Sequence, residues 1–213
     1  ITSSFDNNFA LPPIEEFEKK ITPKTKAFLI CNPGNPTGYL YSKEEILQLA
    51  AIAKKYDIFL IFDEVYREFV YDGAQHFSIM QVSDIEQNAI MIDSVSKRFS
   101  MCGARIGWVV SKNKEVMKSI LKFAQARLSP PTYSQIGAEK AFDVPESYFE
   151  EVLKEYTQRR NVLIDALQRV EGVRVSMPKG AFYCIAELPV ENAEDFCIWL
   201  LDQFSVDNQT VML

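Results

Sequence analysis

The segment Ala89-Ile-Met-Ile-Asp-Ser-Val-Ser-Lys-Arg-Phe-Ser-Met-Cys-Gly-Ala-Arg-Ile-Gly-Trp-Val-Val110 decides how the rest of the chain is interpreted. Its two short apolar runs, residues 89–92 and 106–110, are typical of β-strands, and they bracket a segment rich in turn-forming residues. Lys97 lies in this segment, just beyond the first run. Because burial disfavours the charged form of lysine, an amine leaving a buried strand can act as a nucleophile toward an aldehyde.

Groups that bind phosphate flank this lysine. Ser94 precedes Lys97 by three residues and Arg105 follows it by eight. A hydroxyl and a guanidinium together can hold a phosphate. An aldehyde and a phosphate on one small molecule describe pyridoxal phosphate. A single lysine after a strand is usually a surface residue, so this interpretation depends on the segments upstream.

Two further buried strands are predicted before residue 89. Residues 26–31 and 57–62 are continuous apolar runs. The first run leads into Asn32-Pro-Gly-Asn-Pro-Thr-Gly38, a stretch composed almost entirely of turn formers, and the second leads into Asp63-Glu-Val-Tyr66. Between them, a capping box at Ser42-Lys-Glu-Glu45 predicts an amphipathic helix that continues to about Tyr56.

This alternation of strands and helices predicts an α/β fold. The sheet should be parallel or mostly parallel, with helices covering both faces. In such sheets, ligands bind at the carboxyl ends of the strands. Residues 32–38, 63–66 and 94–97 all fall at that edge, so we expect their side chains to form one site.

The polar side chains at these strand ends suit one cofactor. A buried carboxylate at Asp63 can keep a pyridine nitrogen protonated. Tyr66 and Asn35 can both reach the phenolic oxygen of the same ring. Lys97 can bind the aldehyde and later carry a proton. Each of these residues alone is more often structural, and their order at successive strand ends favours the functional interpretation.

Composition argues against several classes of protein. The 213 residues are 47% hydrophobic, which is enough for a core. No apolar run approaches the roughly 20 residues of a membrane span, and the first residues lack the parts of a secretory signal. The net charge is −6 with no dense Lys/Arg cluster, so we expect neither nucleic-acid binding nor membrane insertion. We expect a cytoplasmic protein.

Cysteine and histidine offer no obvious metal site. The cysteines are widely spaced, with no Cys-x-x-Cys pair, and are interpreted as reduced thiols. They are Cys31, Cys102, Cys184 and Cys197. His76 is the single histidine, so a His-rich metal site is ruled out and a His-dependent triad would rest on one loop residue. We expect no bound metal.

The pattern changes near residue 145, where Pro145 opens a long predicted helix that stops at Gly172. We therefore expect residues 1–144 to form part of a large cofactor-binding domain. Residues 145–213 should form an interdomain helix and part of a smaller α+β domain. Other predicted helices cover residues 12–20, 113–126, 133–142 and 193–204, and predicted strands fall within residues 173–188 and begin at residues 210–213.

Three motifs occur in a characteristic order: Asn-Pro-x-Asn-Pro-Thr-Gly, then Asp-Glu-x-Tyr, then Ser-x-Ser-Lys with an arginine eight residues later. The chain thereby resembles the class I aminotransferases, the aspartate aminotransferase-like group of fold-type I pyridoxal phosphate enzymes. The resemblance implies that Lys97 forms a Schiff base with the cofactor and supports the other roles suggested above. The positions matching the family's cofactor-binding residues are Asn35, Asp63, Tyr66, Ser94, Lys97 and Arg105.

The resemblance also implies a reaction and an assembly. We expect transfer of an amino group between an amino acid, aspartate or a similar one, and a 2-oxo acid, by a homodimer. The Asn35–Pro36 peptide bond should be cis, so that Asn35 points inward. Pro178-Lys-Gly-Ala-Phe-Tyr183 resembles the first strand of the family's small domain. Further family elements would lie before residue 1 and after Leu213, so we expect an internal fragment that is inactive alone.

Two other functions stay open. A different fold-type I enzyme, such as a carbon–sulfur lyase, would use the same cofactor-binding residues. A non-catalytic effector domain of aminotransferase-like fold would share the fold but catalyse no reaction. Activity assays with a panel of amino and oxo acids distinguish the three.

Overall fold

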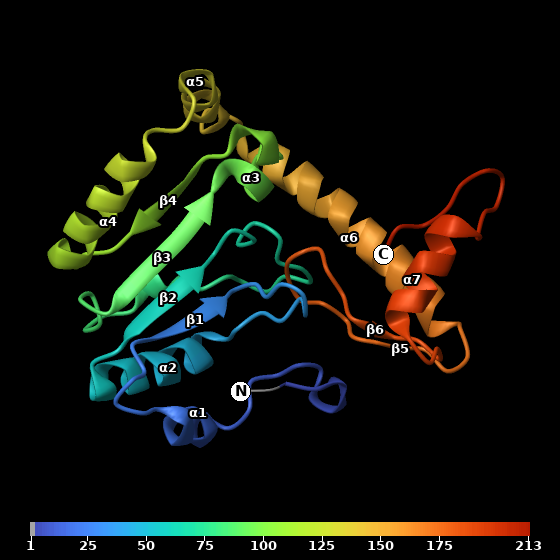
Figure 1. The fold of residues 1–213 in the computed structure, drawn as a ribbon, viewed down its shortest axis with the longest axis horizontal. Helices are drawn as coiled ribbons and strands as arrows, with labels where there is room; N and C mark the ends of the chain where they lie inside the picture. The colour runs from blue at the N-terminus through green and yellow to red at the C-terminus, as the bar shows by residue number, and fades with distance from the viewer. Residues whose placement is uncertain (1–2) are drawn as a thin grey trace.

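A four-stranded sheet forms the centre of the molecule in the computed structural model, which describes residues 3–213 (Figure 1). Strands β1 (Ala27–Cys31), β2 (Phe59–Asp63) and β3 (Ala89–Ser94) are neighbours in that order and run parallel. The fourth strand, β4 (Gly107–Val110), pairs antiparallel with β3. The expected α/β fold with a mostly parallel sheet is therefore confirmed.

Helix α2 (Lys43–Tyr56) covers one face of this sheet and begins as predicted. The Ser42 hydroxyl accepts a hydrogen bond from the Glu45 backbone N–H at 3.1 Å, and the Glu45 carboxylate accepts one from Ser42 N–H at 2.7 Å. This capping box satisfies two backbone donors that the helix itself leaves free. The core beneath α2 is buried, and each large apolar side chain in it contributes about 1.5–3 kcal/mol. Its members include Ile30, Ile46, Leu49, Ala53, Leu60, Phe62 and Met91.

The opposite face of the sheet is partly exposed at β1. Leu29 alternates with the core residue Ile30, so it points to this face, and it is 74% exposed. Helix α4 (Lys114–Arg127) has no buried residue, and helix α1 (Ile14–Lys20) buries Phe17 in the core on the α2 side. Within residues 3–213, this second face is thus open to solvent at Leu29 of β1.

The remaining helices follow the sequence pattern closely. In Figure 1, α6 is a long helix that leads from the region of α5 to a small ribbon and α7. The bounds are α3 (Val95–Arg98), α5 (Thr132–Ala141), α6 (Glu146–Gln168) and α7 (Ala193–Asp202), with ribbon strands β5 (Arg174–Val175) and β6 (Ala186–Glu187) and short 3-10 helices η1 (Phe5–Asn7), η2 (Ile79–Gln81) and η3 (Cys102–Ala104). The division into two domains near residue 145 remains a prediction.

The strand expected to begin at Thr210 is absent. Residues 210–213 have no regular structure. The Thr210 hydroxyl instead donates a hydrogen bond to the carbonyl oxygen of Leu200 in α7. Thr210 is therefore bound to the end of a helix, and residues 210–213 pair with no strand that the structure describes.

Membrane-spanning helices, metal-ligand clusters and disulfides are all absent from residues 3–213. None of the helices there combines the length and apolar character that a membrane crossing requires. The same residues contain no group of three or more metal-ligating side chains. The four cysteines are all unpaired.

Candidate active site

The carboxyl ends of the three parallel strands meet at one edge of the sheet. The register pairs Cys31 of β1 with Asp63 of β2, and Asp63 with Ile92 of β3. The segments after these strands therefore start side by side, as the sequence pattern predicted. They contain Asn35, Tyr66 and Lys97, respectively.

Asp63 is the last residue of β2 and is half-buried. Because side chains alternate along a strand, it lies on the face opposite to the core residue Phe62. Its Oδ1 accepts a hydrogen bond from the Val65 backbone N–H at 3.1 Å. In the part of the chain that the structure describes, Oδ2 makes no hydrogen bond, so one carboxylate oxygen is available to a ligand.

Lys97 lies on a single helical turn, where the sequence pattern had suggested a loop. The Ser94 hydroxyl accepts a hydrogen bond from Ser96 N–H at 3.1 Å and caps this turn, α3. Val95 is fully buried and anchors the turn. The turn forms because the Ser94 hydroxyl accepts a hydrogen bond from one of its free backbone N–H groups and the burial of Val95 stabilises its apolar side.

The amine of Lys97 points toward aromatic rings. Its Nζ lies 5.8 Å from the centroid of the Tyr66 ring and 5.6 Å from that of Phe182. Both distances are within the range of cation–π attraction. Lys97 is half-buried and directed at Tyr66, which brings together two of the residues predicted to share one site.

Tyr66 is buried at 4% exposure and stands at the centre of the site. Its hydroxyl oxygen lies 2.7 Å from that of Tyr183. Burial raises the pKa of Tyr66. Asn35 follows β1 at the same edge, and its predicted role at the cofactor's phenolic oxygen remains a prediction. The Asn35–Pro36 bond is cis, which confirms that prediction, and the Asn32–Pro33 bond is cis as well.

Arg105 occupies a different position from the other candidates. It is exposed, adopts a left-handed conformation with φ of 57°, and its Nη1 donates a hydrogen bond to the Cys102 carbonyl at 2.9 Å. Its guanidinium is thus held within its own turn. The predicted role of Arg105 at a phosphate remains a prediction.

The donor set at this edge fits pyridoxal phosphate chemically. That cofactor presents a basic ring nitrogen, a phenolic oxygen, an aldehyde and a phosphate. Asp63 offers a free carboxylate oxygen, Tyr66 a phenol with an adjacent amide from Asn35, and Lys97 a primary amine. Ser94 adds a hydroxyl, so most of the cofactor's polar groups have a complementary side chain here.

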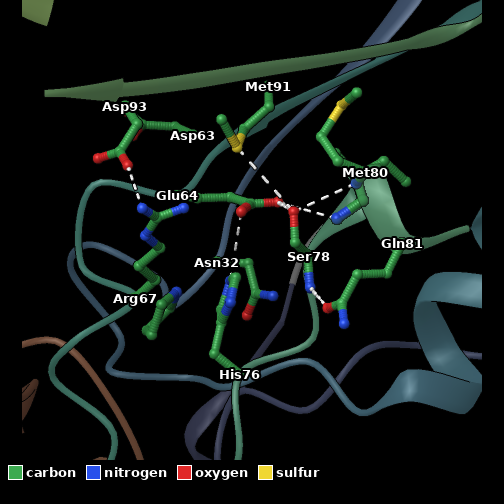
Figure 2. A network of polar contacts seen from close by, with 12 residues as sticks. Asn32, Asp63, Glu64, Arg67, His76, Ser78, Met80, Gln81, Met91 and Asp93 are labelled. Carbon is green, nitrogen blue, oxygen red and sulfur yellow. Dashed lines mark hydrogen bonds and ion pairs between the residues drawn. The ribbon is translucent and has the colours of Figure 1, made fainter. Parts of the chain in front are cut away.

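A buried polar network behind the site was not predicted from the sequence (Figure 2). Glu64 is fully buried, and its Oε1 accepts hydrogen bonds from Ser78 Oγ and Ile79 N–H, both at 2.9 Å. Its Oε2 faces Nε2 of His76 at 3.8 Å. Burial raises the pKa of Glu64. Alternation from Asp63 could have indicated that Glu64 points toward the core side.

An ion-pair cluster ties two site segments together. Asp93 of β3 is 1% exposed, and its Oδ2 lies 3.3 Å from Arg67 and 3.6 Å from Arg98. Arg98 also pairs with Glu68. Because Arg67 follows Tyr66 and Arg98 follows Lys97 in the chain, these pairs fix Tyr66 and Lys97 relative to each other. No local signal could have predicted contacts between segments so far apart in sequence.

The buried histidine predicts a stability loss in acid. Burial, aided by the charge of Arg67, lowers the pKa of His76 to about 4 from 6.5. Below pH 6.5, His76 is therefore protonated in the unfolded chain but stays neutral in the folded protein until the pH approaches 4. Stability from His76 is complete above pH 6.5 and is lost as the pH falls toward 4, by about 3 kcal/mol, since one pKa unit corresponds to about 1.4 kcal/mol. Glu64, whose pKa is raised, has the opposite dependence and favours folding at low pH.

His76→Asn isolates this effect, because asparagine is a polar side chain that does not titrate. Urea unfolding followed by tryptophan fluorescence from pH 8 to pH 4 measures the free energy of unfolding of both proteins. We expect the unmodified protein to lose about 3 kcal/mol more than the variant. Two curves that run parallel across this range would contradict the prediction.

Comparison with known proteins gives one family. The family model described as "Aminotransferase class I and II" matches residues 6–209. An aspartate aminotransferase of Bacillus sp. (strain YM-2) is 34% identical over 207 residues, which cover 96% of this chain and 52% of the relative. Aromatic-amino-acid aminotransferase 2 of Thermococcus litoralis is 36% identical over 84% of this chain and 46% of the relative.

Solved structures agree with these matches. An aspartate aminotransferase from Thermotoga maritima superposes with a TM-score of 0.83 at 33% identity, over 94% of this chain and 52% of that protein. An alanine aminotransferase from Pyrococcus furiosus gives a TM-score of 0.82 at 32% identity, over 93% and 52%. The chain spans about half the length of the relatives it matches.

Proposed function

Because the chain belongs to the class I and II aminotransferase family, we propose that the whole protein is a pyridoxal phosphate-dependent aminotransferase. It moves an amino group between an amino acid and a 2-oxo acid. The observation that carries this proposal is the placement of Lys97 against Tyr66, at the edge where Asp63 ends the neighbouring strand. An amine, a phenol and a carboxylate at one sheet edge are the groups that this chemistry requires.

The cofactor, when bound, supplies an aldehyde that reacts with amines and a protonated ring that withdraws electrons from the substrate Cα. Asp63 keeps the ring nitrogen protonated through its free carboxylate oxygen. Tyr66 and Asn35 hold the phenolic oxygen. Lys97 Nζ holds the cofactor in the resting enzyme and then moves a proton to and from the substrate Cα.

Two further residues complete the proposed site. Ser94 and Arg105 bind the phosphate, Ser94 through its hydroxyl hydrogen and Arg105 by turning its guanidinium from Cys102 toward the ligand. Phe182 also faces the Lys97 amine, with its ring centroid 5.6 Å from Nζ, and favours its position by cation–π attraction. The site thereby combines groups for cofactor binding with an amine placed for proton transfer.

The substrate class is proposed from the relatives. Several proteins of 34–36% identity are named aspartate aminotransferases, and others are named for aromatic amino acids. We take aspartate or a similar amino acid as the amino donor. A cytoplasmic homodimer is the proposed working form.

A substrate panel tests the proposal. The full-length protein, loaded with pyridoxal phosphate, is incubated with single amino acids and 2-oxo acids, and new amino acids are measured by chromatography. Formation of a new amino acid with aspartate as donor supports the proposal. Release of ammonia and a thiol from a sulfur amino acid would identify a carbon–sulfur lyase instead. Tight cofactor binding with no product of either kind would identify an effector domain.

A further inference from the structure

Residues 178–183 lie against the candidate site although α6 separates them from it in sequence. The Gly180 backbone N–H donates a hydrogen bond to the Gly38 carbonyl at 3.0 Å, and Ala181 N–H donates one to the Phe69 carbonyl at 2.9 Å. One bond reaches the loop after β1 and the other reaches the turn after β2. The segment is thus attached to two of the three strand ends that form the site.

Two glycines allow this close approach. A Cβ at Gly180 would lie 2.5 Å from Cβ of Pro33, and a Cβ at Gly38, whose φ is +66°, would lie 2.2 Å from Cβ of Pro178. Both distances are too short for any real side chain. The backbones are therefore in direct contact, and the segment has little freedom to shift relative to the loop that carries Asn35.

This attachment places Tyr183 on Tyr66. Their hydroxyl oxygens are 2.7 Å apart, and their ring centroids are 5.5 Å apart at an interplanar angle of 85°. The neighbouring Phe182 ring packs edge-on against Tyr66 at 5.1 Å. Tyr66, the predicted partner of the cofactor's phenolic oxygen, therefore has a fixed hydroxyl neighbour of its own.

The direction of this hydrogen bond follows from counting donors. A phenol has one hydrogen to donate and two lone pairs to accept with. If the Tyr66 hydrogen is to reach the cofactor, Tyr183 can only be the donor in the bond between the two hydroxyls. The other titratable groups near Tyr66 are Cys31 and Lys97.

We propose that Tyr183 is a positioning residue, whose hydroxyl donates to Tyr66 and so directs the Tyr66 hydrogen toward the phenolic oxygen of pyridoxal phosphate. This inference rests on the proposed function. Accepting this hydrogen bond polarises the Tyr66 O–H bond and makes Tyr66 a stronger donor. The anionic form of the cofactor's phenolic oxygen is thereby stabilised, which lowers the pH at which the bound cofactor loses its proton.

Tyr183→Phe in the full-length holoenzyme removes the hydroxyl and keeps the ring. The pH midpoint of the cofactor's visible absorption band should rise by about 0.3–1 pH unit, the size expected for losing about one hydrogen bond's worth of stabilisation. Tyr156→Phe is the matched control, since Tyr156 packs on Phe69 and Phe182 of the same cluster. Its midpoint should not move.

A double variant separates a direct effect from a general disturbance. In a Tyr66→Phe background, Tyr183→Phe should cause no additional shift, because the residue acts through Tyr66. If Tyr183→Phe folds poorly, 3-fluorotyrosine at position 183 replaces it. Its more acidic hydroxyl donates more strongly and should lower the midpoint.

Three results would overturn the inference: an unchanged midpoint in Tyr183→Phe, a midpoint that falls, or an equal shift in Tyr156→Phe. A protein that develops no visible band with pyridoxal phosphate, in either the unmodified or the variant form, contradicts the proposed function itself. The two failures are thus distinguishable in one titration series.

Discussion

Lys97→Ala is expected to lower the transamination rate of the full-length holoenzyme by at least about 10³-fold. Positioned proton transfer alone contributes about 10²–10⁴-fold, and this variant also loses the amine that holds the cofactor. The fold should be retained, because Lys97 is half-buried and its described contacts are with the rings of Tyr66 and Phe182. Steady-state kinetics measure the rate, and circular dichroism checks the fold.

Two controls accompany this variant. Lys112→Ala removes a lysine whose side chain is 61% exposed and pairs with Glu86, and its activity should be unchanged. Borohydride reduction of the unmodified holoenzyme, followed by peptide mapping, should label Lys97. A label on another lysine, or a Lys97→Ala variant that keeps more than a tenth of the activity, would show that the amine has been assigned wrongly.

Asp63→Ala should reduce the rate by about 10²–10⁴-fold. Removing one partner of a buried ion pair costs about 3–5 kcal/mol, and each 1.4 kcal/mol is a factor of about ten in rate. Without the carboxylate, the ring nitrogen of the cofactor loses its proton and withdraws electrons poorly. The loss should appear in kcat, with little change in the free energy of unfolding, because the hydrogen bond that Asp63 makes is to the nearby Val65 N–H.

The adjacent glutamate provides a matched control with the opposite outcome. Glu64→Ala leaves the hydroxyl of Ser78 and the N–H of Ile79 without their acceptor, which should cost about 1–3 kcal/mol of stability. Its rate, measured well below the unfolding temperature, should stay within a few-fold of normal. Equal rate losses for Asp63→Ala and Glu64→Ala would contradict the separation of roles between the two carboxylates.

The two carboxylates show how alternation along a strand separates chemistry from packing. Asp63 lies on the face of the sheet that carries Cys31 and the loop residues of the site. Glu64 lies toward η2 and the core beneath α2. One residue step moves a carboxylate from a partly open ligand edge into a buried network, because successive side chains point to opposite faces.

Arg98 plays a comparable supporting role beside Lys97. Its guanidinium lies between Asp93 and Glu68 and over the ring of Phe99. Burial lowers the pKa of Arg98 and raises that of Asp93, so both groups depend on their partners for charge compensation. Arg98 is thus held by ion pairs and by an aromatic ring, and this restrains the helical turn on which Lys97 lies.

Local sequence patterns determined most of the secondary structure of this protein. Continuous apolar runs predicted β1, β2 and β3, since fully buried strands need no polar face. The capping box at Ser42 predicted the start of α2, and the turn formers after Cys31 predicted the loop that holds Asn35. These signals succeed because strand burial, helix caps and tight turns each depend on residues close together in the chain.

Other features were decided only by the tertiary structure. The chain after β3 stays at the strand-end edge, in α3 and η3, so β4 returns antiparallel. Thr210 finds a carbonyl in α7 instead of a strand partner. The contact between Tyr66 and Tyr183 joins residues 117 positions apart. Their hydroxyls meet because the backbone of residues 178–183 packs without a gap on Gly38 and Pro33, and no local pattern can encode a contact that depends on packing between distant segments.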